Sequence, residues 1–337
     1  MYVTHTNSVY SEEITLLDYL PIPQYVHQVL PGGMIVNKGL SITPIELTKC
    51  LFNASRGASE GTVEAVQVLT KDPECRTGFI LAAGGNIWSG YLSNIKRTSN
   101  YPTYKVTPMG VTQVQAGYLA NKLGSFDYIS TDSTSCISGH AGWFAARNLL
   151  ALDILDAVVV VAVDNGTSEE YLSVFAEHGL AKIAKEEGDP DITKFRLGQG
   201  GNVTIFESEQ YYGSHSRLAL GKLHGIHIAA ESYTSPLGIA CTGEGYSKAI
   251  AGVDCSGIDF VKTHSTFSKD NDIEQVIINK QFGEIPVINY KLRIGHTMGA
   301  ATAVETAIAI KEESGTFLSL GAGMGNVFSA AVVEVLT

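Results

Sequence analysis

Short apolar segments recur along the chain, each bounded by glycine or polar residues, and helical patterns separate them. Segments of this kind are typical of strands that are buried on both faces of a parallel or mixed sheet. The predicted strands are residues 79–83, 157–163, 203–206, 226–230, 259–262, 287–290, 317–320 and 330–335. The predicted helices are residues 61–69, 112–123, 136–152, 244–251, 272–278 and 298–313. This alternation predicts an α/β layered fold.

The segments that begin at Cys136 and His296 share a pattern. Each has a reactive residue, Gly three positions later, Ala five positions later, and then a small-residue helix that leads into a buried strand. If the halves are duplicates related by a pseudo-twofold axis, the two helix starts meet near the centre. The expected halves are residues 1–210 and 211–337. Chance similarity between two helices rich in alanine and glycine is the alternative explanation.

Composition limits the class of protein. The 337 residues are 45% hydrophobic and 17% charged, which is typical of a well-buried globular chain. The net charge of −11 argues against nucleic acid as the main partner. A local basic patch for an acidic partner stays open; its candidate residues are Lys96, Arg97, Lys262, Lys269 and Lys280.

The cysteines and the apolar stretches indicate a compartment. The five cysteines include no Cys-x-x-Cys pair, which fits a reducing environment and predicts no zinc motif. No signal peptide is evident, and no apolar stretch reaches the length of a membrane span. We therefore expect a cytoplasmic protein with no membrane partner.

Cys136 follows small polar residues and precedes a helix of small and apolar residues. Small polar side chains are preferred at helix N-termini, and the helix dipole there lowers the pKa of a thiol. The pattern therefore predicts an activated nucleophile. The alternative is that Cys136 is a small buried hydrophobic residue, as many free cysteines are.

Two histidines lie in loops where a site is expected. His264 follows the predicted strand 259–262, and sites in α/β sheets gather at the carboxyl ends of strands. His296 lies between Gly295 and a helix start, five residues after Lys291. A lone loop histidine is usually a surface or capping residue, so their positions at strand ends and beside glycine distinguish these two.

At these positions the chain resembles the β-ketoacyl synthases, or ketosynthases, of the thiolase superfamily. The family's cysteine motif is matched by Thr134-Ser135-Cys136, its His-Gly-Thr loop by His264-Ser265-Thr266, its Lys-x-x-x-Gly-His-x-x-Gly-Ala-Ala-Gly motif by residues 291–302, and its Gly-Phe-Gly-Gly-x-Asn loop by residues 321–326. The resemblance extends over residues 77–337. It implies a thiolase-like fold, with two pseudo-duplicated α/β halves in α-β-α-β-α layers.

The resemblance also implies roles for single residues. Cys136 would accept the acyl group, and the backbone N–H groups of Cys136 and Ala322 would form the oxyanion hole. His264 and His296 would hold the carbonyl of a malonyl-type thioester and stabilise the enolate that decarboxylation leaves. Lys291 would supply the surroundings of these imidazoles.

Partners are likewise implied by the resemblance. Thr266 and Ser268 match positions that bind the pantetheine arm of an acyl carrier protein, although ordinary loop capping is the alternative. A homodimer, or a heterodimer with a ketosynthase-like subunit, is expected. Neither a metal nor an organic cofactor is expected from any residue cluster in the sequence.

Several residues depart from the family pattern. Ser265, Thr302 and Met324 replace glycines, and Ala322 stands where a phenylalanine usually gates the acyl pocket. The family's acidic residue after His264 falls near Gln275, with Glu274 displaced by one position. The leading interpretation is a β-ketoacyl-[acyl carrier protein] synthase of fatty-acid or polyketide biosynthesis. The alternatives are a cysteine-dependent acyltransferase without condensation and a non-catalytic partner that resembles a chain-length factor.

Overall fold

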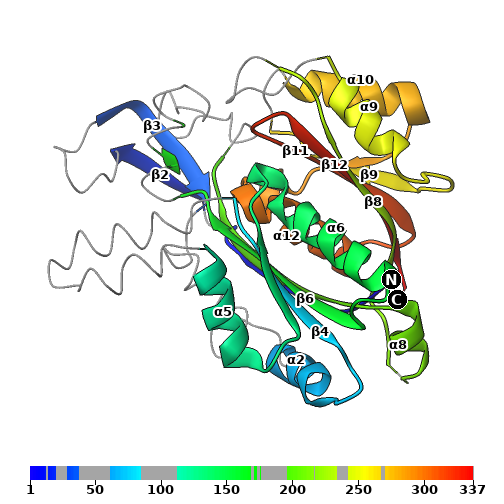
Figure 1. The fold of residues 1–337 in the computed structure, drawn as a ribbon. Helices are drawn as coiled ribbons and strands as arrows, with labels where there is room; N and C mark the ends of the chain where they lie inside the picture. Colours follow the sequence, from blue (N-terminus) through cyan, green and yellow to red (C-terminus); the bar gives the residue numbers. More distant parts are fainter. Residues whose placement is uncertain are drawn as a thin grey trace, which may run out of the picture.

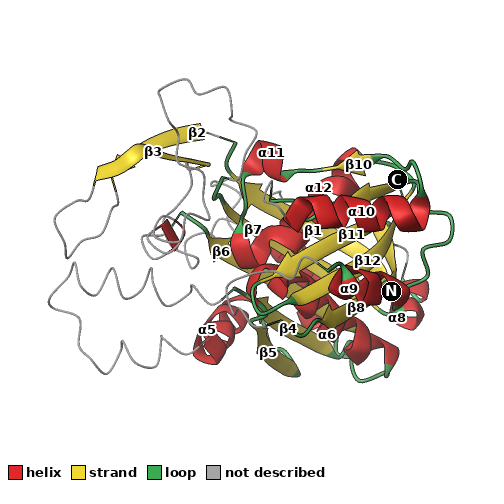
Figure 2. Cartoon of the chain, turned by 90° about the horizontal axis from the view of Figure 1, so that it is seen from above, coloured by secondary structure: helices red, strands yellow, loops and turns green. Residues whose placement is uncertain are grey.

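Ten strands form one mixed sheet in the part of the chain that the structure describes (Figure 1). The structure is a computed structural model, and it describes residues 1–12, 14–19, 29–37, 61–84, 112–167, 171–172, 175, 196–215, 217–233, 242–266 and 270–336. The strands of the sheet are β1 (Tyr2–Tyr10), β4 (Thr77–Ala82), β5 (Tyr128–Asp132), β6 (Ala157–Asn165), β7 (Gln199–Glu207), β8 (Gly221–Ala230), β9 (Phe260–Lys262), β10 (Val287–Ile288), β11 (Thr316–Gly323) and β12 (Val327–Val335). Strands β2 (Ile14–Tyr19) and β3 (Val29–Asn37) form a separate pair, set apart from this sheet in Figure 2.

Helices connect and cover these strands. They are α2 (Thr62–Lys71), α5 (Thr112–Leu123), α6 (Ser138–Ala151), α8 (Glu209–Gly213), α9 (Glu244–Ala251), α10 (Asp270–Phe282), α11 (Lys291–Ile294) and α12 (Ala301–Glu312). Two short 3₁₀ helices, η2 (Ser135–Ile137) and η3 (Met298–Ala300), precede α6 and α12. None of the helices described here has the length and apolar character that a membrane span requires.

The strand order repeats itself on the two sides of one junction. The order is β10-β9-β11-β12-β8-β1-β7-β6-β4-β5, and β8 meets β1 through a short antiparallel pairing at Tyr2 and Val3. Outward from the junction, β1, β7, β6, β4 and β5 match β8, β12, β11, β9 and β10 in order, and each side has antiparallel pairs followed by parallel pairs. The structure therefore contains the two duplicated α/β halves. The predicted boundary at residue 210 falls in α8, between β7 and β8.

Alternate residues of the buried strands belong to different cores, as a period of two requires. In β6, Val158 and Val160 pack in a central core with Trp143 of α6, whereas Val159 and Val161 pack in an outer core with residues of α2 and α5. The strands of the C-terminal half divide their side chains in the same way between the central core and an outer core under α9 and α10. The layers are thus α2/α5, the N-terminal half of the sheet, α6/α12, the C-terminal half of the sheet, and α9/α10 (Figure 1).

The predicted strands and helices are confirmed, with shifts of a few residues at their ends. The sequence does not predict β1, because polar residues occupy buried positions on both faces of this strand. Thr6 and Asn7 are buried there, and the Asn202 side chain donates hydrogen bonds to the Thr6 hydroxyl and the Asn7 carbonyl. It also does not predict β5, an edge strand whose residues are half-buried or exposed.

Candidate active site

Cys136 lies in the tight turn between β5 and α6. It is the middle residue of η2, and the preceding Ser135 has a φ of 50°, a left-handed conformation that is uncommon for a residue other than glycine. The Ser138 hydroxyl fixes the turn, because it accepts a hydrogen bond from the Thr134 N–H (2.9 Å) and donates one to the Ser135 carbonyl (2.7 Å). The predicted α-helix therefore begins at Ser138, after a single 3₁₀ turn that presents the thiol.

The end of β11 packs against this turn. A Cβ added at Gly323 would lie 3.2 Å from the backbone nitrogen of Cys136. Only glycine therefore lets these two segments pack at this separation without a shift. A backbone hydrogen bond from Met324 reaches the Cys136 thiol. Ala322 points the other way, into the outer core that contains Phe328. The small side chain at 322 is thus buried on the face of β11 opposite Gly323.

Burial controls the protonation of Cys136. The residue is 5% exposed, and burial raises the pKa of the thiol to about 11, while the hydrogen bond with Ser135 opposes that rise. The charge of Asp164 raises the pKa further, and the charge of Lys291 lowers it. The expected low pKa is therefore wrong: a single 3₁₀ turn does not offset the loss of solvent around the thiolate.

The two predicted histidines come together. The His264 and His296 rings lie 5.4 Å apart between centroids, with their planes at 88°, and both side chains are buried. His264 follows β9, and His296 precedes η3, which packs against the η2 turn of Cys136. The His296 loop therefore contacts His264 on one side and leads into η3, which contacts the Cys136 turn.

Each histidine is held through its backbone. The His264 and Ser265 N–H groups donate to the two carboxylate oxygens of Glu274, at 2.7 and 2.8 Å. The His296 N–H donates to the Arg196 carbonyl at 2.6 Å. Glu274, not Gln275, is therefore the acidic residue that faces the His264 loop. Ser265 has no positive φ, so this loop does not require the family's glycine.

Both imidazoles are neutral at pH 7. Burial lowers the pKa of His264 and of His296 well below the usual value, and the charge of Lys291 lowers each pKa further. Nδ1 of His264 has no hydrogen-bond partner among the described residues. A buried imidazole nitrogen without a partner is available to a bound substrate.

A buried ion cluster lies beside the imidazoles. Glu305 of α12 pairs with Nζ of Lys291 through Oε1 at 2.6 Å and with Nζ of Lys262 through Oε2 at 2.9 Å. Lys262 therefore does not belong to a basic surface patch, because its side chain is fully buried. Lys280 is exposed on α10, and Lys96, Arg97 and Lys269 lie outside the described residues. The sequence signal for the cluster is a charged residue inside otherwise apolar segments, at Lys262 and at Glu305.

Asp164 is a second acidic residue that the sequence patterns did not identify. Its Oδ2 accepts hydrogen bonds from the N–H groups of Gly84 (3.1 Å) and Gly299 (2.9 Å), and its Oδ1 accepts one from Asn165 (2.9 Å). The side chain is fully buried, and burial raises its pKa to about 6. Asp164 thus joins the ends of β4 and β6 to η3, next to the Cys136 turn.

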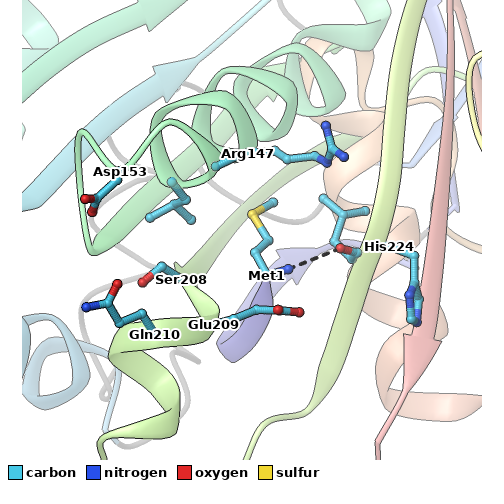
Figure 3. Close-up of a pocket in the computed structure, with 10 residues that line it drawn as sticks. Met1, Arg147, Asp153, Ser208, Glu209, Gln210 and His224 are labelled. Atoms are coloured by element: carbon cyan, nitrogen blue, oxygen red, sulfur yellow. Dashed lines mark hydrogen bonds between the residues drawn. The ribbon is translucent and has the colours of Figure 1, made fainter.

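The predicted pantetheine residues lie at the edge of the described structure. Thr266 is half-buried at the end of the loop that contains His264, and Ser268 lies outside the described residues. A pocket of about 480 Å³ lies elsewhere, at the C-terminal end of α6, where Arg147, Ser208, Glu209 and His224 line it (Figure 3). It is separate from Cys136, which precedes the opposite end of α6.

No family model matches the chain. A protein of Schizosaccharomyces pombe described as a mitochondrial 3-oxoacyl-[acyl-carrier-protein] synthase is 23% identical over 236 residues, which are 61% of this chain and 54% of the relative. 3-Oxoacyl-[acyl-carrier-protein] synthase 2 of Rhizobium meliloti is 24% identical over 202 residues, which are 53% and 47% of the two chains. The chain thus spans about half of the length of these curated relatives.

Solved structures match over nearly the whole chain. A chain from a complex of a type II PKS acyl-carrier protein with its ketosynthase, bound to a hexaketide, has a TM-score of 0.81 at 15% identity, and the match covers 100% of this chain and 99% of that one. A β-ketoacyl synthase from Burkholderia phymatum has a TM-score of 0.75 at 13% identity, with coverage of 100% and 99%. A ketosynthase in complex with its chain length factor, from Xenorhabdus doucetiae, also has a TM-score of 0.75, at 14% identity, with coverage of 99% and 98%. The chain therefore has the thiolase fold of these ketosynthases, and its sequence is similar to those of β-ketoacyl synthases.

Proposed function

We propose that this protein is a β-ketoacyl synthase that condenses an acyl group on Cys136 with a malonyl-type thioester carried by an acyl carrier protein. The observation that supports the proposal best is the pair of buried neutral imidazoles, 5.4 Å apart. His296 leads into η3, which packs against the Cys136 turn. Neutral imidazoles can donate hydrogen bonds to one oxygen atom without giving up a proton. This property suits an enolate, which a charged acid would protonate.

The first step transfers the acyl group. Sγ of Cys136 attacks the thioester carbonyl, the carbon–sulfur bond to the carrier breaks, and the thiol proton leaves with the carrier thiol. Because the pKa of the thiol is about 11, proton loss must accompany bond formation. Backbone N–H groups of Cys136 and Ala322 are the proposed donors to the oxyanion, and one such donor is worth about 2.7–4 kcal/mol.

The second step forms the new carbon–carbon bond. The carboxylate of the malonyl group leaves as carbon dioxide, and its bonding electrons form an enolate whose oxygen accepts hydrogen bonds from His264 and His296. The enolate carbon then attacks the acyl carbonyl, and the Cys136 thiolate leaves and takes up a proton. Lys291 and Glu305 form an ion pair beside the imidazoles.

Intact mass and product analysis test the proposal. With an acyl carrier donor we expect an acyl mass on the protein, and Cys136→Ala should abolish it. With a malonyl carrier added, we expect carbon dioxide and a product that is longer by two carbons. His264→Ala should slow condensation by at least about a hundredfold and leave acylation intact. Full condensation by that variant would contradict the enolate role.

A non-catalytic partner subunit is the second candidate. The high pKa of the Cys136 thiol favours it, because a thiol in this state is a weak nucleophile. One of the matching structures is a complex of a ketosynthase with its chain length factor. A protein that is never acylated, but that changes product length when it is added to an active ketosynthase, would support this role. Acylation without carbon dioxide release would instead support simple acyl transfer.

A further inference from the structure

Lys262 is a second buried cation beside the candidate active site. It is the last residue of β9, two positions before His264, and none of its surface is exposed. Its Nζ donates hydrogen bonds to Oε2 of Glu305 (2.9 Å) and to the Leu320 carbonyl (2.8 Å). A lysine is rarely buried so completely unless it is paired, so this position indicates a specific role.

Glu305 divides its carboxylate between two lysines. Oε1 contacts Lys291 and Oε2 contacts Lys262, so one acidic side chain stands between two ammonium groups. A carboxylate with one partner could rotate, whereas this arrangement fixes its plane and, with it, the position of Lys291. The cluster of Lys262, Lys291 and Glu305 thus contains two basic groups and one acidic group.

We propose that Lys262 is a positioning residue of the active site, which fixes Glu305 and Lys291 and places a second positive charge beside the imidazoles so that His264 and His296 stay neutral as the pH falls. The catalytic importance of Lys262 rests on the proposed condensation. The effect of the Lys262 charge on the protonation of the two histidines does not depend on that function.

The charged groups around the histidines agree with this role. The groups that interact with His264 come from several elements: Lys262 on β9, Lys291 on α11, His140 on α6, Glu274 on α10 and the neighbouring His296. Glu305 on α12 acts through the two lysines that it pairs with. After burial, the charge of Lys291 lowers the pKa of both His264 and His296, and the charge of Lys262 lowers each of them as well. Both carboxylate oxygens of Glu274 accept hydrogen bonds from backbone N–H groups, those of His264 and Ser265, and, among the described residues, not from the imidazole rings.

Lys262→Met tests the proposal, because methionine has a similar length and no charge. Removing a positive charge raises the pKa of an imidazole, so protonation begins at higher pH. We expect the NMR titration of His264 or His296, assigned with His→Gln variants, to move upward by about one pH unit. The acid limb of the pH–rate profile for condensation should move in the same direction. Lys280→Met, on the exposed surface of α10, should move neither curve.

The NMR titration and the condensation assay together distinguish failure of the inference from failure of the proposed function. If condensation is never observed, the NMR titration still reports the effect of Lys262 on the imidazoles. Identical titrations in the natural protein and in Lys262→Met would overturn the inference, since Lys262 would then be uncharged or without influence. If Lys262→Met does not fold, as circular dichroism would show, Lys262→Gln replaces it, with the same expected direction and the same contrary result.

Discussion

At the scale of single residues, burial sets the charge of the candidate site. It raises the pKa of the Cys136 thiol to about 11, lowers the pKa of His264 and of His296, and raises that of Asp164 to about 6. Uncharged forms are favoured in each case because a low-dielectric site penalises an ion. The positions of Cys136 and the histidines follow from local motifs. Their protonation does not, because it depends on how much chain covers them.

The thiol of Cys136 should react slowly near neutral pH. Only the thiolate reacts with iodoacetamide, so a pKa of about 11 predicts that the rate rises about tenfold per pH unit between pH 7 and pH 9. Peptide mass spectrometry measures this rate at Cys136 separately from the other cysteines. In the unfolded protein the same peptide should react faster at pH 7. A rate that has already levelled off at pH 7 would show the low pKa expected at a helix N-terminus.

At the scale of elements, the sequence predicts most strands because they are buried on both faces. The continuous apolar run of β6 is such a case, with Val158 and Val159 in different cores. β1 is not predicted, since the consecutive polar residues Thr6 and Asn7 are both buried in it, one on each face. The Asn202 side chain of β7 donates to the Thr6 hydroxyl and to the Asn7 carbonyl. Such pairing is visible only when both strands are in place.

The crossing of α6 with α12 gives a prediction at this scale. A Cβ added at Gly139 would lie 2.7 Å from the Cβ of Ala303 and 2.8 Å from its backbone nitrogen, so Gly139→Ala forces the helices apart. We expect the free energy of unfolding in urea to fall by about 1–3 kcal/mol. In α5, a Cβ added at Gly117 meets nothing within 4 Å, so Gly117→Ala should instead raise it by about 0.5–1 kcal/mol. Equal effects of the two substitutions would contradict this packing.

At the scale of the whole molecule, the duplicated halves bring the site together. Cys136 and His296 precede α6 and α12, which occupy equivalent places in the two halves, and the short sequence similarity between these segments predicts that relation. The polar contacts between separate elements were not predictable from motifs. Lys262 and Glu305 meet only after β9 and α12 pack together. Asp164 accepts hydrogen bonds mainly from backbone N–H groups, with the Tyr171 hydroxyl as a further donor, and no side-chain pattern reveals backbone donors.

Asp164 hydrogen-bonds to both halves of the chain, and its ionisation therefore makes the stability of the folded protein depend on pH. It lies on β6 of the N-terminal half, and its Oδ2 accepts hydrogen bonds from Gly84 after β4 and from Gly299 of η3 in the C-terminal half. Burial raises its pKa from 3.8 to about 6, so the folded chain binds the proton more tightly than the unfolded chain. The proton-linked contribution to stability is complete below about pH 4 and is lost as the pH rises through 6, an effect of about 3 kcal/mol by pH 7.

Asp164→Asn removes this titration and keeps one oxygen for the N–H donors. Only the natural protein loses stability as Asp164 ionises. Between pH 4.5 and pH 7.5, the free energy of unfolding of the natural protein should therefore fall by about 2–3 kcal/mol relative to that of Asp164→Asn. Urea unfolding at several pH values measures that difference. Glu284→Gln, which changes an exposed side chain, should give a curve parallel to that of the natural protein. A parallel curve for Asp164→Asn would mean that the buried carboxylate does not take up a proton in this range.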